Sequence, residues 1–298
     1  MKRILPVLAG AFVACCAQAE VTIRDDTGIE ITLAAPARRI VSLAPHATEL
    51  AFAAGAGDRI VGAVRGSNHP IAARDILVIG DVQTLDLERI VALRPDLVIT
   101  WPYTTPAQVA KLKGRGIAVF TTDPASIDGI ATNIERLGTL AGTQSVAAES
   151  AARFRAEVAQ ATSRSPSRPV RVFYQVWGRP LFTIGGGHLI SQAIRACGGE
   201  NVFAALSIPA PQVSIEAVIA ARPDMIIAGA DEARRPVWLD DWNRWPEVPA
   251  VRDRLLHVVD ADRLHRPGPR FAAGVRELCD AMGRARSIHD VAPAKVTR

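Results

Sequence analysis

The apolar positions of the chain follow the same order twice, first at helical spacing and then as a short continuous run. "LERIVALRPDLVITW" (87–101) and "IEAVIAARPDMIIAG" (215–229) keep Glu, Ala, Arg, Pro, Asp and Ile in identical places, 128 residues apart. Helical spacing in the first copy is set by Leu87, Ile90, Val91 and Leu93. Pro95 then ends the helix, and "DLVIT" is typical of a buried strand. Each copy therefore predicts a helix, a tight turn and a strand.

Further α/β patterns precede both copies. "RIVSLAPHATELAFAAG" (39–55) lies before the first copy, and "VRVFYQV" (170–176) with "HLISQAIRACGG" (188–199) lies before the second. Each part combines a strand-like run with a helical one. The sequence therefore predicts an α/β fold with two Rossmann-like lobes around central β-sheets, residues 20–141 and 165–285, and a ligand cleft between the lobes.

A long amphipathic helix is predicted between the lobes, within residues 142–164. Thr143 is a candidate N-cap. One apolar stripe is formed by Ala147, Ala151, Phe154 and Val158. A helix over residues 144–161 would span roughly 27 Å, the width of a small domain. This length favours one rigid strut between the lobes, although the pattern also fits a surface helix of the first lobe. Residues 286–298 are expected to form a tail.

The N-terminus has the pattern of a secretory signal peptide, expected over residues 1–19. Two basic residues precede the apolar run "ILPVLAGAFVA", and the small residues Ala17 and Ala19 predict cleavage after Ala19. "FVAC" is a poor lipoprotein box because Phe12 stands where Leu is usual, so lipid anchoring is not favoured. No later apolar run approaches about 18 to 20 residues, so we expect a soluble protein exported to the periplasm.

Two cysteines, Cys197 and Cys279, remain after removal of the expected signal. Export would bring them into an oxidising compartment, where cysteines commonly pair. We therefore predict a disulfide within the second lobe, with two buried free thiols as the alternative. A loop of this length would contribute roughly 4 kcal/mol of stability under the chain-entropy model.

Composition restricts the class of protein. The chain has 298 residues, of which 49% are apolar and 22% charged, as in a folded globular protein. The net charge is +5 and the isoelectric point is near 9.4. The basic residues are scattered, without a Lys/Arg cluster interleaved with aromatics, so we expect a solvated basic surface and no nucleic-acid partner.

Loops that follow predicted strands carry the candidate ligand-binding residues. Open α/β sheets bind ligands at the carboxyl ends of their strands, and in two lobes these ends face a cleft. Flat aromatic rings there suit a large planar macrocycle, although core packing can explain any single ring. The first-lobe candidates are His46, Arg65, His69, Trp101 and Tyr103. The second-lobe candidates are Trp177, Phe182, His188, Asp262, His265 and Arg266.

Catalysis and resident metal binding have little support in these loops. A neutral cleft histidine could coordinate the metal of a ligand, but no pair has the close spacing of a zinc site, so we expect no metal site. "TIGGGH" lacks phosphate-loop spacing and fits a turn better. An exported enzyme would have Asp262 and Glu49 as its carboxylate pair, but Glu49 is explained more simply by the first turn of its helix. We therefore expect a binding protein and not an enzyme.

Five motifs, in order and with compatible spacing, resemble one family. They are "SLAPHATELAFAAG", "LERIVALRPDLVITW", "CGGENVF", "PQVSIEAVIAARPD" and "RPGPR". They are similar to the helical-backbone periplasmic binding proteins of ABC importers for iron chelates and cobalamin, and among these to the cobalamin binders. The resemblance covers about residues 39–285. It implies a monomeric receptor with no intrinsic cofactor, which binds cobalamin or another corrinoid and delivers it to a permease and its ATPase complex.

The resemblance gives the repeated glutamates a role. In the family a glutamate on each lobe docks onto arginines of the permease, and the matching residues are Glu88 and Glu216. Asp86 and Ser214 can cap their helices, which would place both glutamates in exposed first turns favoured by the helix macrodipole. A duplication that copied a glutamate without any partner is the alternative.

Pocket positions match the cobalamin binders only in part. Trp101 and Phe182 correspond to aromatic pocket positions of these relatives. Further aromatics are expected at three positions that are here Gly66, Val82 and Ala210. Trp177 stands where a glycine is expected and could compensate. Haem and a ferric siderophore therefore remain alternative ligands.

Overall fold

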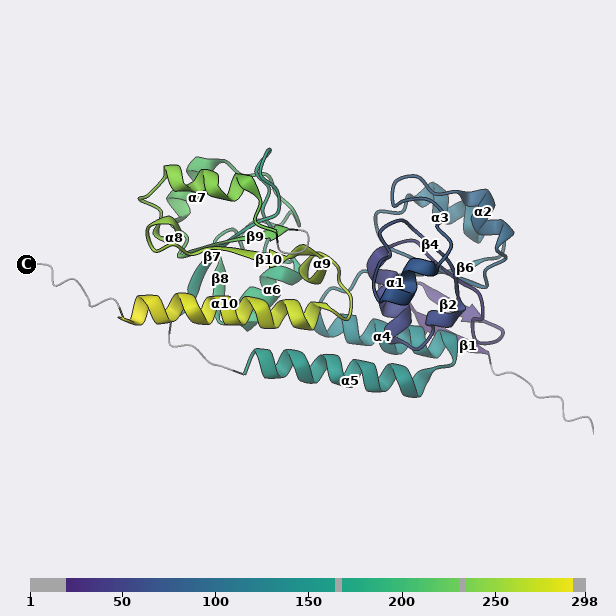
Figure 1. Ribbon diagram of the computed structural model, residues 1–298. Helices are drawn as coiled ribbons and strands as arrows, with labels where there is room; N and C mark the ends of the chain where they lie inside the picture. Colours follow the sequence, from purple (N-terminus) through teal and green to yellow (C-terminus); the bar gives the residue numbers. More distant parts are fainter. Residues whose placement is uncertain (1–19, 164–167, 231–233, 292–298) are drawn as a thin grey trace, which may run out of the picture.

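Two α/β lobes lie side by side on a layer of long helices (Figure 1). The computed structural model describes residues 20–163, 168–230 and 234–291. The signal segment expected at residues 1–19 lies outside the described residues, as do residues 292–298. Within the described residues, no helix is both long and apolar enough to cross a membrane.

The first lobe is built around a parallel sheet in the order β4-β3-β5-β6, which an antiparallel hairpin of β1 and β2 precedes. Its strands are β1 (Val21–Arg24), β2 (Glu30–Leu33), β3 (Ile40–Ser42), β4 (Ile60–Ala63), β5 (Leu97–Thr100) and β6 (Ala118–Thr121). Its α-helices are α1 (Pro45–Ala53), α2 (Leu87–Ala92), α3 (Pro106–Lys113) and α4 (Ile127–Ala141). Short 3₁₀ turns are η1 (Gly57–Arg59) and η2 (Ile71–Asp75).

The second lobe contains a parallel sheet in the order β10-β9-β7-β8. Its strands are β7 (Val170–Gln175), β8 (Gly199–Asn201), β9 (Met225–Ala230) and β10 (Leu256–Asp260). Its α-helices are α6 (Leu189–Ala196), α7 (Ile215–Ala221), α8 (Pro249–Arg252), α9 (Ala261–Leu264) and α10 (Phe271–Val291). A longer 3₁₀ segment, η4 (Val237–Arg244), follows β9.

The two sheets have the same strand order, so the duplication visible in the repeated line extends over both lobes. Counted along the chain within each four-stranded sheet, the order is second, first, third, fourth. The repeated line forms α2 with β5 and α7 with β9. Between helix and strand, Arg94 (φ 46°) and Arg222 (φ 45°) both adopt the left-handed conformation. The predicted helix, turn and strand are therefore confirmed in both copies.

Helix α5 (Gln144–Ala161) connects the lobes and occupies the residues predicted for it. It packs against α4 of the first lobe and α10 of the second. The predicted cap was wrong, because the Thr143 side chain accepts no hydrogen bond from the first turn. The backbone there is not extended (φ −120°, ψ 33°), and the hydroxyl donates instead to the carbonyl of Ala54 at the end of α1, 2.6 Å away.

The largest apolar core runs through both lobes and the helical layer. It includes Ile99 of β5, Phe154 of α5, Tyr174 of β7 and Phe271 of α10. Because side chains alternate along a strand, the neighbouring residues face smaller cores on the opposite sides of the two sheets. The shared core makes the helical layer common to both lobes.

Helix α10 corrects the predicted tail, because it continues to Val291 and not only to residue 285. Ala285 is fully buried, and the Arg286 guanidinium donates to the carbonyls of Cys197 (2.5 Å) and Gly198 (3.2 Å) at the end of α6. The predicted disulfide is confirmed between Cys197 and Cys279, and it joins the end of α6 to α10.

Candidate ligand-binding site between the lobes

An aromatic cluster lies at the carboxyl end of β5 in the first lobe. Trp101 directly follows β5, and His46 lies in the first turn of α1. The Trp101 ring centroid is 5.4 Å from that of His46 and 4.6 Å from that of Tyr103. Tyr103 is 73% exposed, whereas His46 is buried. Three of the predicted first-lobe candidates are therefore in contact, and the cluster extends from the interior to the surface.

Three buried polar atoms, in this cluster or directly beside it, have no hydrogen-bond partner among the described residues. They are His46 Nε2, Thr100 Oγ1 and Trp101 Nε1. Burial, together with the charge of Arg266, lowers the pKa of His46 to about 3, so its imidazole is neutral at physiological pH. Buried polar atoms normally find partners, so these three can bond to a ligand or to water.

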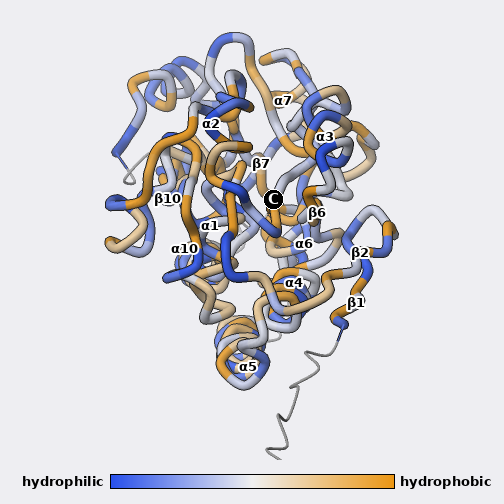
Figure 2. The backbone as a smooth tube through the Cα atoms, turned by 90° about the vertical axis from the view of Figure 1, so that its right-hand side faces the viewer, coloured by the Kyte–Doolittle hydropathy of each residue, from blue (hydrophilic) through white to orange (hydrophobic). Residues whose placement is uncertain are grey.

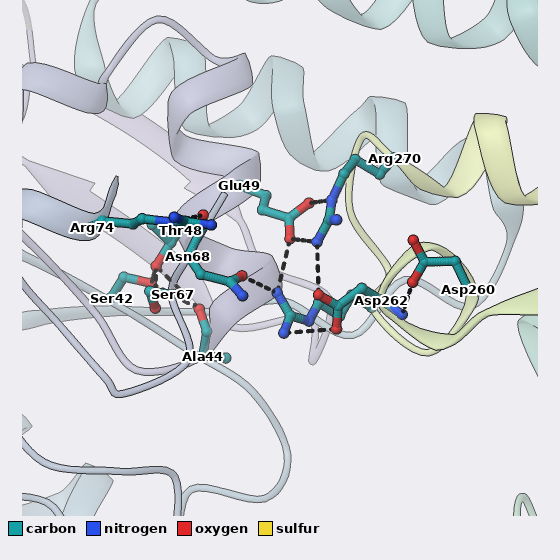
Figure 3. A network of polar contacts seen from close by, with 11 residues as sticks. Ser42, Ala44, Thr48, Glu49, Ser67, Asn68, Arg74, Asp260, Asp262 and Arg270 are labelled. Atoms are coloured by element: carbon teal, nitrogen blue, oxygen red, sulfur yellow. Dashed lines mark hydrogen bonds and ion pairs between the residues drawn. The ribbon is translucent and has the colours of Figure 1, made fainter. Parts of the chain in front are cut away.

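A charged cluster links the two lobes (Figure 3). Glu49 of α1, whose side chain is 1% exposed, accepts two bonds from Arg270 at the start of α10, at 2.7 and 2.9 Å. Arg266 lies 3.4 Å from the same carboxylate. The interpretation of Glu49 as a first-turn residue was wrong, because it lies in the second turn of α1 and the first turn contains no acidic residue.

Asp262 and Arg266 form the second-lobe part of this cluster. Their side chains are 2.8 Å apart, and Asp262 also lies 3.6 Å from Arg270. Arg266 donates to Asn68 Oδ1 of the first lobe at 2.9 Å. The charges of Glu49 and Asp262 balance those of the two arginines. The predicted site residues Asp262 and Arg266 therefore present an acceptor and a donor side by side, within a cluster of no net charge.

The second-lobe aromatics lie apart from the first-lobe rings. Trp177 is 60% exposed, and Phe182 is half-buried. Their backbones form an antiparallel bridge, and Phe182 forms another with Gln212. Among the described residues, no ring of the second lobe contacts Trp101 or Tyr103. Each lobe thus presents its own aromatic surface near the carboxyl end of a central strand.

The remaining histidines are explained partly by local structure. His188 caps α6, where its Nδ1 accepts from the Ile190 N–H at 3.1 Å, and burial lowers its pKa to about 4. His265 Nε2 is 3.0 Å from the Tyr174 hydroxyl. Partial burial and the charge of Arg270 lower the pKa of His69. In residues 20–163, 168–230 and 234–291 no group of three or more His, Cys, Asp or Glu side chains is arranged to hold a metal ion.

Arg65, also a predicted ligand residue, occupies the loop after β4. It is exposed, and its backbone N–H donates to the carbonyl of Gly80 at 2.8 Å. The backbone N–H groups of Thr84 and Gln83, and less strongly the charge of Arg65, lower the pKa of Asp81. The charge of Arg65 therefore acts on Asp81, and among the described residues no hydrogen bond or ion pair joins Arg65 to the Glu49 cluster.

Arg270 and Asn68 were not predicted from the sequence. The single acidic residue in the α1 sequence "PHATELAFA" could have signalled a buried partner, since buried carboxylates are normally paired. The partner itself is more than 200 residues away, and no local pattern connects it to Glu49.

The repeated glutamates lie where the sequence predicted. Arg89 N–H donates to Asp86 Oδ1 at 2.9 Å, and Ala217 N–H donates to Ser214 Oγ at 3.2 Å, so both caps are confirmed. Glu88 and Glu216 are exposed in the first turns of α2 and α7. Both helices lie on the side of the molecule opposite α5, in the view of Figure 1 and in the end-on view of Figure 2.

The fold and the candidate site define a class of protein, the two-lobed solute receptors. The defining features are two lobes with parallel sheets, a long connecting helix, and candidate binding groups at the carboxyl ends of the strands. The chain belongs to the periplasmic binding protein family, whose model matches residues 40–262.

Named relatives are similar over most of the chain. A vitamin B12-binding protein of Vibrio parahaemolyticus is 37% identical over 250 residues, covering 82% of this chain and 89% of the relative. The crystal structure of the periplasmic vitamin B12 binding protein BtuF of Vibrio cholerae has a TM-score of 0.76 and 35% identity, covering 84% and 98% of the two chains. The apo form of the periplasmic haem-binding protein RhuT of Roseiflexus sp. RS-1 has a TM-score of 0.74 and 28% identity, covering 83% and 98%.

Proposed function

We propose that this protein is a periplasmic receptor that binds cobalamin or a related corrinoid between its lobes and delivers it to the permease of an ABC importer. The observation that carries the proposal is the pairing of an aromatic cluster on one lobe with the Asp262–Arg266 pair on the other. The similarity to vitamin B12-binding proteins over 82% of the chain supports this choice of ligand.

The ligand assignment follows from the chemistry of the two surfaces. Exposed aromatic faces bury large apolar area at low entropic cost, which suits a flat macrocycle. A corrinoid carries amide groups around its ring, and an amide can donate to Asp262 while it accepts from Arg266. The residues that we assign to the ligand are His46, Arg65, Trp101, Trp177, Phe182, Asp262, His265 and Arg266.

Trp177 has a particular place in this proposal. Gly66, Val82 and Ala210 lack the rings expected at these positions in cobalamin binders, which leaves a less aromatic pocket. The Trp177 ring is 60% exposed, and its Nε1 donates to the carbonyl of Arg179 at 3.2 Å. It is therefore available to cover part of a ligand face.

Delivery to the permease is assigned to Glu88 and Glu216. Both carboxylates are exposed, and their helices α2 and α7 lie on the side of the molecule away from the helical layer. The Glu216 backbone N–H and the Ser214 hydroxyl lower the pKa of Glu216, which keeps it charged at neutral pH. Facing arginines of a permease would complement both charges. We propose a monomeric receptor, exported through residues 1–19, that performs no catalysis and needs no intrinsic cofactor.

The test is retention of a chromophore. The mature protein is incubated in parallel with cobalamin, cobinamide, haemin and a ferric siderophore, and is then separated from free ligand by gel filtration. We expect a one-to-one complex with a corrinoid, whose spectrum does not change with time. One-to-one retention of haemin or the siderophore, with no corrinoid bound, would replace this ligand assignment. Turnover of the bound compound would contradict the receptor function.

A further inference from the structure

We propose that Glu49 is a positioning residue of the ligand site: from the first lobe it holds Arg266 directly, and Asp262 through Arg270, in the second lobe. The inference rests on the proposed function, because Asp262 and Arg266 are the groups assigned there to the ligand. Glu49 itself is enclosed by its partners and is not assigned to the ligand.

Glu49 is buried, and its contacts hold two arginines of the second lobe in place. Its side chain is 1% exposed, and both carboxylate oxygens accept from Arg270, at 2.7 and 2.9 Å. This bidentate geometry fixes both the distance and the orientation of a guanidinium. Arg266 and Arg270 are about one-fifth exposed, so the pairs are shielded from water on most sides. The carboxylate therefore determines where both arginines of the second lobe lie.

The first-lobe side of the contact is itself held in place (Figure 3). The Thr48 hydroxyl, next to Glu49, lies within hydrogen-bond distance of Ser42 Oγ (2.8 Å) and Ser67 Oγ (3.0 Å), and all three hydroxyls are buried. Ser67 precedes Asn68, the second first-lobe partner of Arg266. Helix α1 and the Asn68 loop are thus fixed relative to each other, and they present two acceptors to one guanidinium.

The second-lobe loop lies directly against the carboxylate. A Cβ atom placed on Gly268 would be 3.4 Å from Glu49 Oε2, so little more than the space of one methyl group separates the backbone between the two arginines from the carboxylate. Asp262 lies 2.8 Å from Arg266 and 3.6 Å from Arg270. Movement of either arginine would displace Asp262 as well. Both groups assigned to the ligand therefore depend on a residue in the other lobe.

Stability alone does not explain such an arrangement. Apolar residues of similar size often replace a buried ion pair without loss of stability, whereas removal of one partner leaves an uncompensated charge. What the ions supply is a defined geometry between two lobes. Without Glu49, Arg266 and Arg270 would repel each other, and the lobes would lose this fixed contact.

The first measurement needs no ligand. Arg115 and Asn243 are exposed positions on different lobes. Spin labels attached at Arg115→Cys and Asn243→Cys give the distribution of inter-lobe distances by pulsed electron paramagnetic resonance. We expect a narrow distribution in the otherwise unchanged protein and a broader or displaced one after Glu49→Gln. The control is Asp26→Asn, which removes a carboxylate bonded to Arg136 at 2.6 Å within the first lobe. It should leave the distance unchanged.

The second measurement is a double-mutant cycle on corrinoid affinity. We expect Glu49→Gln to weaken binding about tenfold or more and Asp26→Asn to leave it unchanged. In an Arg266→Ala background the Glu49→Gln change should have little further effect, because the positioned group is gone. A merely structural role predicts equal losses in both backgrounds, and that result would overturn the proposal.

The proposal can still be tested if the Glu49 variant does not fold or if the protein binds no corrinoid. If Glu49→Gln does not fold, Arg270→Lys keeps the charge but loses the bidentate bond, and should give a smaller change in the same direction. An unchanged distance distribution and unchanged affinity in that variant would refute positioning. If the unmodified protein binds no corrinoid, the proposed function fails, while the distance measurement still decides the role of Glu49.

Discussion

Asp96 and Asp224 make the same contact in the two lobes. The Asp96 carboxylate accepts the backbone N–H groups of Arg38 and Arg39 at 2.9 and 3.0 Å, and the Asp224 carboxylate accepts that of Arg171 at 3.0 Å. Each aspartate also donates its own N–H, to the carbonyl of Arg39 at 3.0 Å or of Arg171 at 2.8 Å. Each therefore ties the start of the third strand of its parallel sheet, β5 or β9, to the first strand of that sheet, β3 or β7.

The residues that are identical in the two copies of the repeated line are of two kinds: those that the fold uses in both lobes, and the glutamate. Arginine in a left-handed turn and aspartate at the strand start are used by the fold in both copies. The glutamate is not used in this way. Among the described residues the Glu88 side chain forms no hydrogen bond or ion pair, and the Glu216 side chain interacts with its own backbone N–H and the Ser214 hydroxyl, both at the start of its own helix. The presence of a glutamate at both positions must therefore be explained by function or by ancestry.

Replacement of the two aspartates should destabilise the protein unequally. Asp224 is 6% exposed, whereas Asp96 is exposed, so water can replace the lost bonds only at Asp96. We expect Asp224→Ala to cost about 1 to 3 kcal/mol of unfolding free energy and Asp96→Ala about 1 kcal/mol or less. Urea denaturation measures both. A larger loss for Asp96→Ala would show that burial does not govern this contact.

Local patterns in the sequence predicted the lobes, the repeated helix–turn–strand units and the disulfide. These features depend on hydrophobic periodicity, on the positions of prolines and on the number of cysteines, all of which can be recognised directly in the sequence. They also predicted the first-turn positions of Glu88 and Glu216, because Asp86 and Ser214 are ordinary helix caps.

The contact between the lobes could not be predicted in the same way. Glu49 and Arg270 are 221 residues apart, and their pairing depends on how the lobes pack on α5 and α10. The wrong N-cap at Thr143 has a similar origin, since the tertiary contact with Ala54 replaced a local bond. Local propensity is weaker than packing at such positions.

Removal of the disulfide should lower stability without changing the site. The bond joins α6 to α10 across 82 residues of sequence. We expect the double variant Cys197→Ser and Cys279→Ser to lose about 2 to 5 kcal/mol of unfolding free energy. Thermal unfolding measures the loss, and corrinoid affinity at low temperature should stay unchanged. Two free thiols in the denatured, unreduced mature protein would contradict the bond itself.

The aromatic residues of both lobes should carry ligand affinity. We expect Trp101→Ala, Phe182→Ala and Trp177→Ala each to cost about 1 to 3 kcal/mol of binding, because each removes a flat face from the proposed site. The matched control is Trp245→Ala, since Trp245 packs on Trp242 within the second lobe. Equilibrium titration with a corrinoid measures all four. Unchanged affinity in the three site variants would exclude a stacked macrocycle.

The buried imidazole of His46 should make stability fall in acid. Burial and Arg266 hold its folded-state pKa at about 3, below the ordinary value of 6.5. Between these values the unfolded chain binds a proton that the folded protein does not, so stability is complete above about pH 6.5 and decreases as the pH falls. At pH 4.5 the cost from this group is about 2 to 3 kcal/mol.

His46→Gln removes the titrating group and should reduce the difference in unfolding free energy between pH 7 and pH 4.5 by that amount. His188, whose pKa is also lowered by burial, remains in both proteins and cancels in the comparison. Urea denaturation at the two pH values gives the difference. An equal pH dependence in the two proteins would mean that His46 is not held neutral by the fold.

The glutamates of the repeated line should matter for transport and not for binding. Both lie in exposed first turns, so Glu88→Ala and Glu216→Ala lose only the interaction of a carboxylate with the start of a helix. We expect ligand affinity and thermal stability to stay nearly unchanged while uptake falls. Charge reversal to lysine at both positions should reduce uptake further, because arginines of the permease would be repelled and not merely left without a partner.

Uptake of labelled ligand into proteoliposomes that contain the cognate permease, with receptor in excess, measures the effect. The exposed neighbour Arg89 provides a control on α2, since Arg89→Ala removes a charge of opposite sign from the next position of the same helix without changing either carboxylate. If the glutamate was only copied by duplication and has no partner, every variant that folds should show normal uptake. Uptake by the double lysine variant at the rate of the unmodified protein would therefore assign the repeated glutamate to ancestry, whereas reduced uptake with unchanged affinity would assign it to the permease.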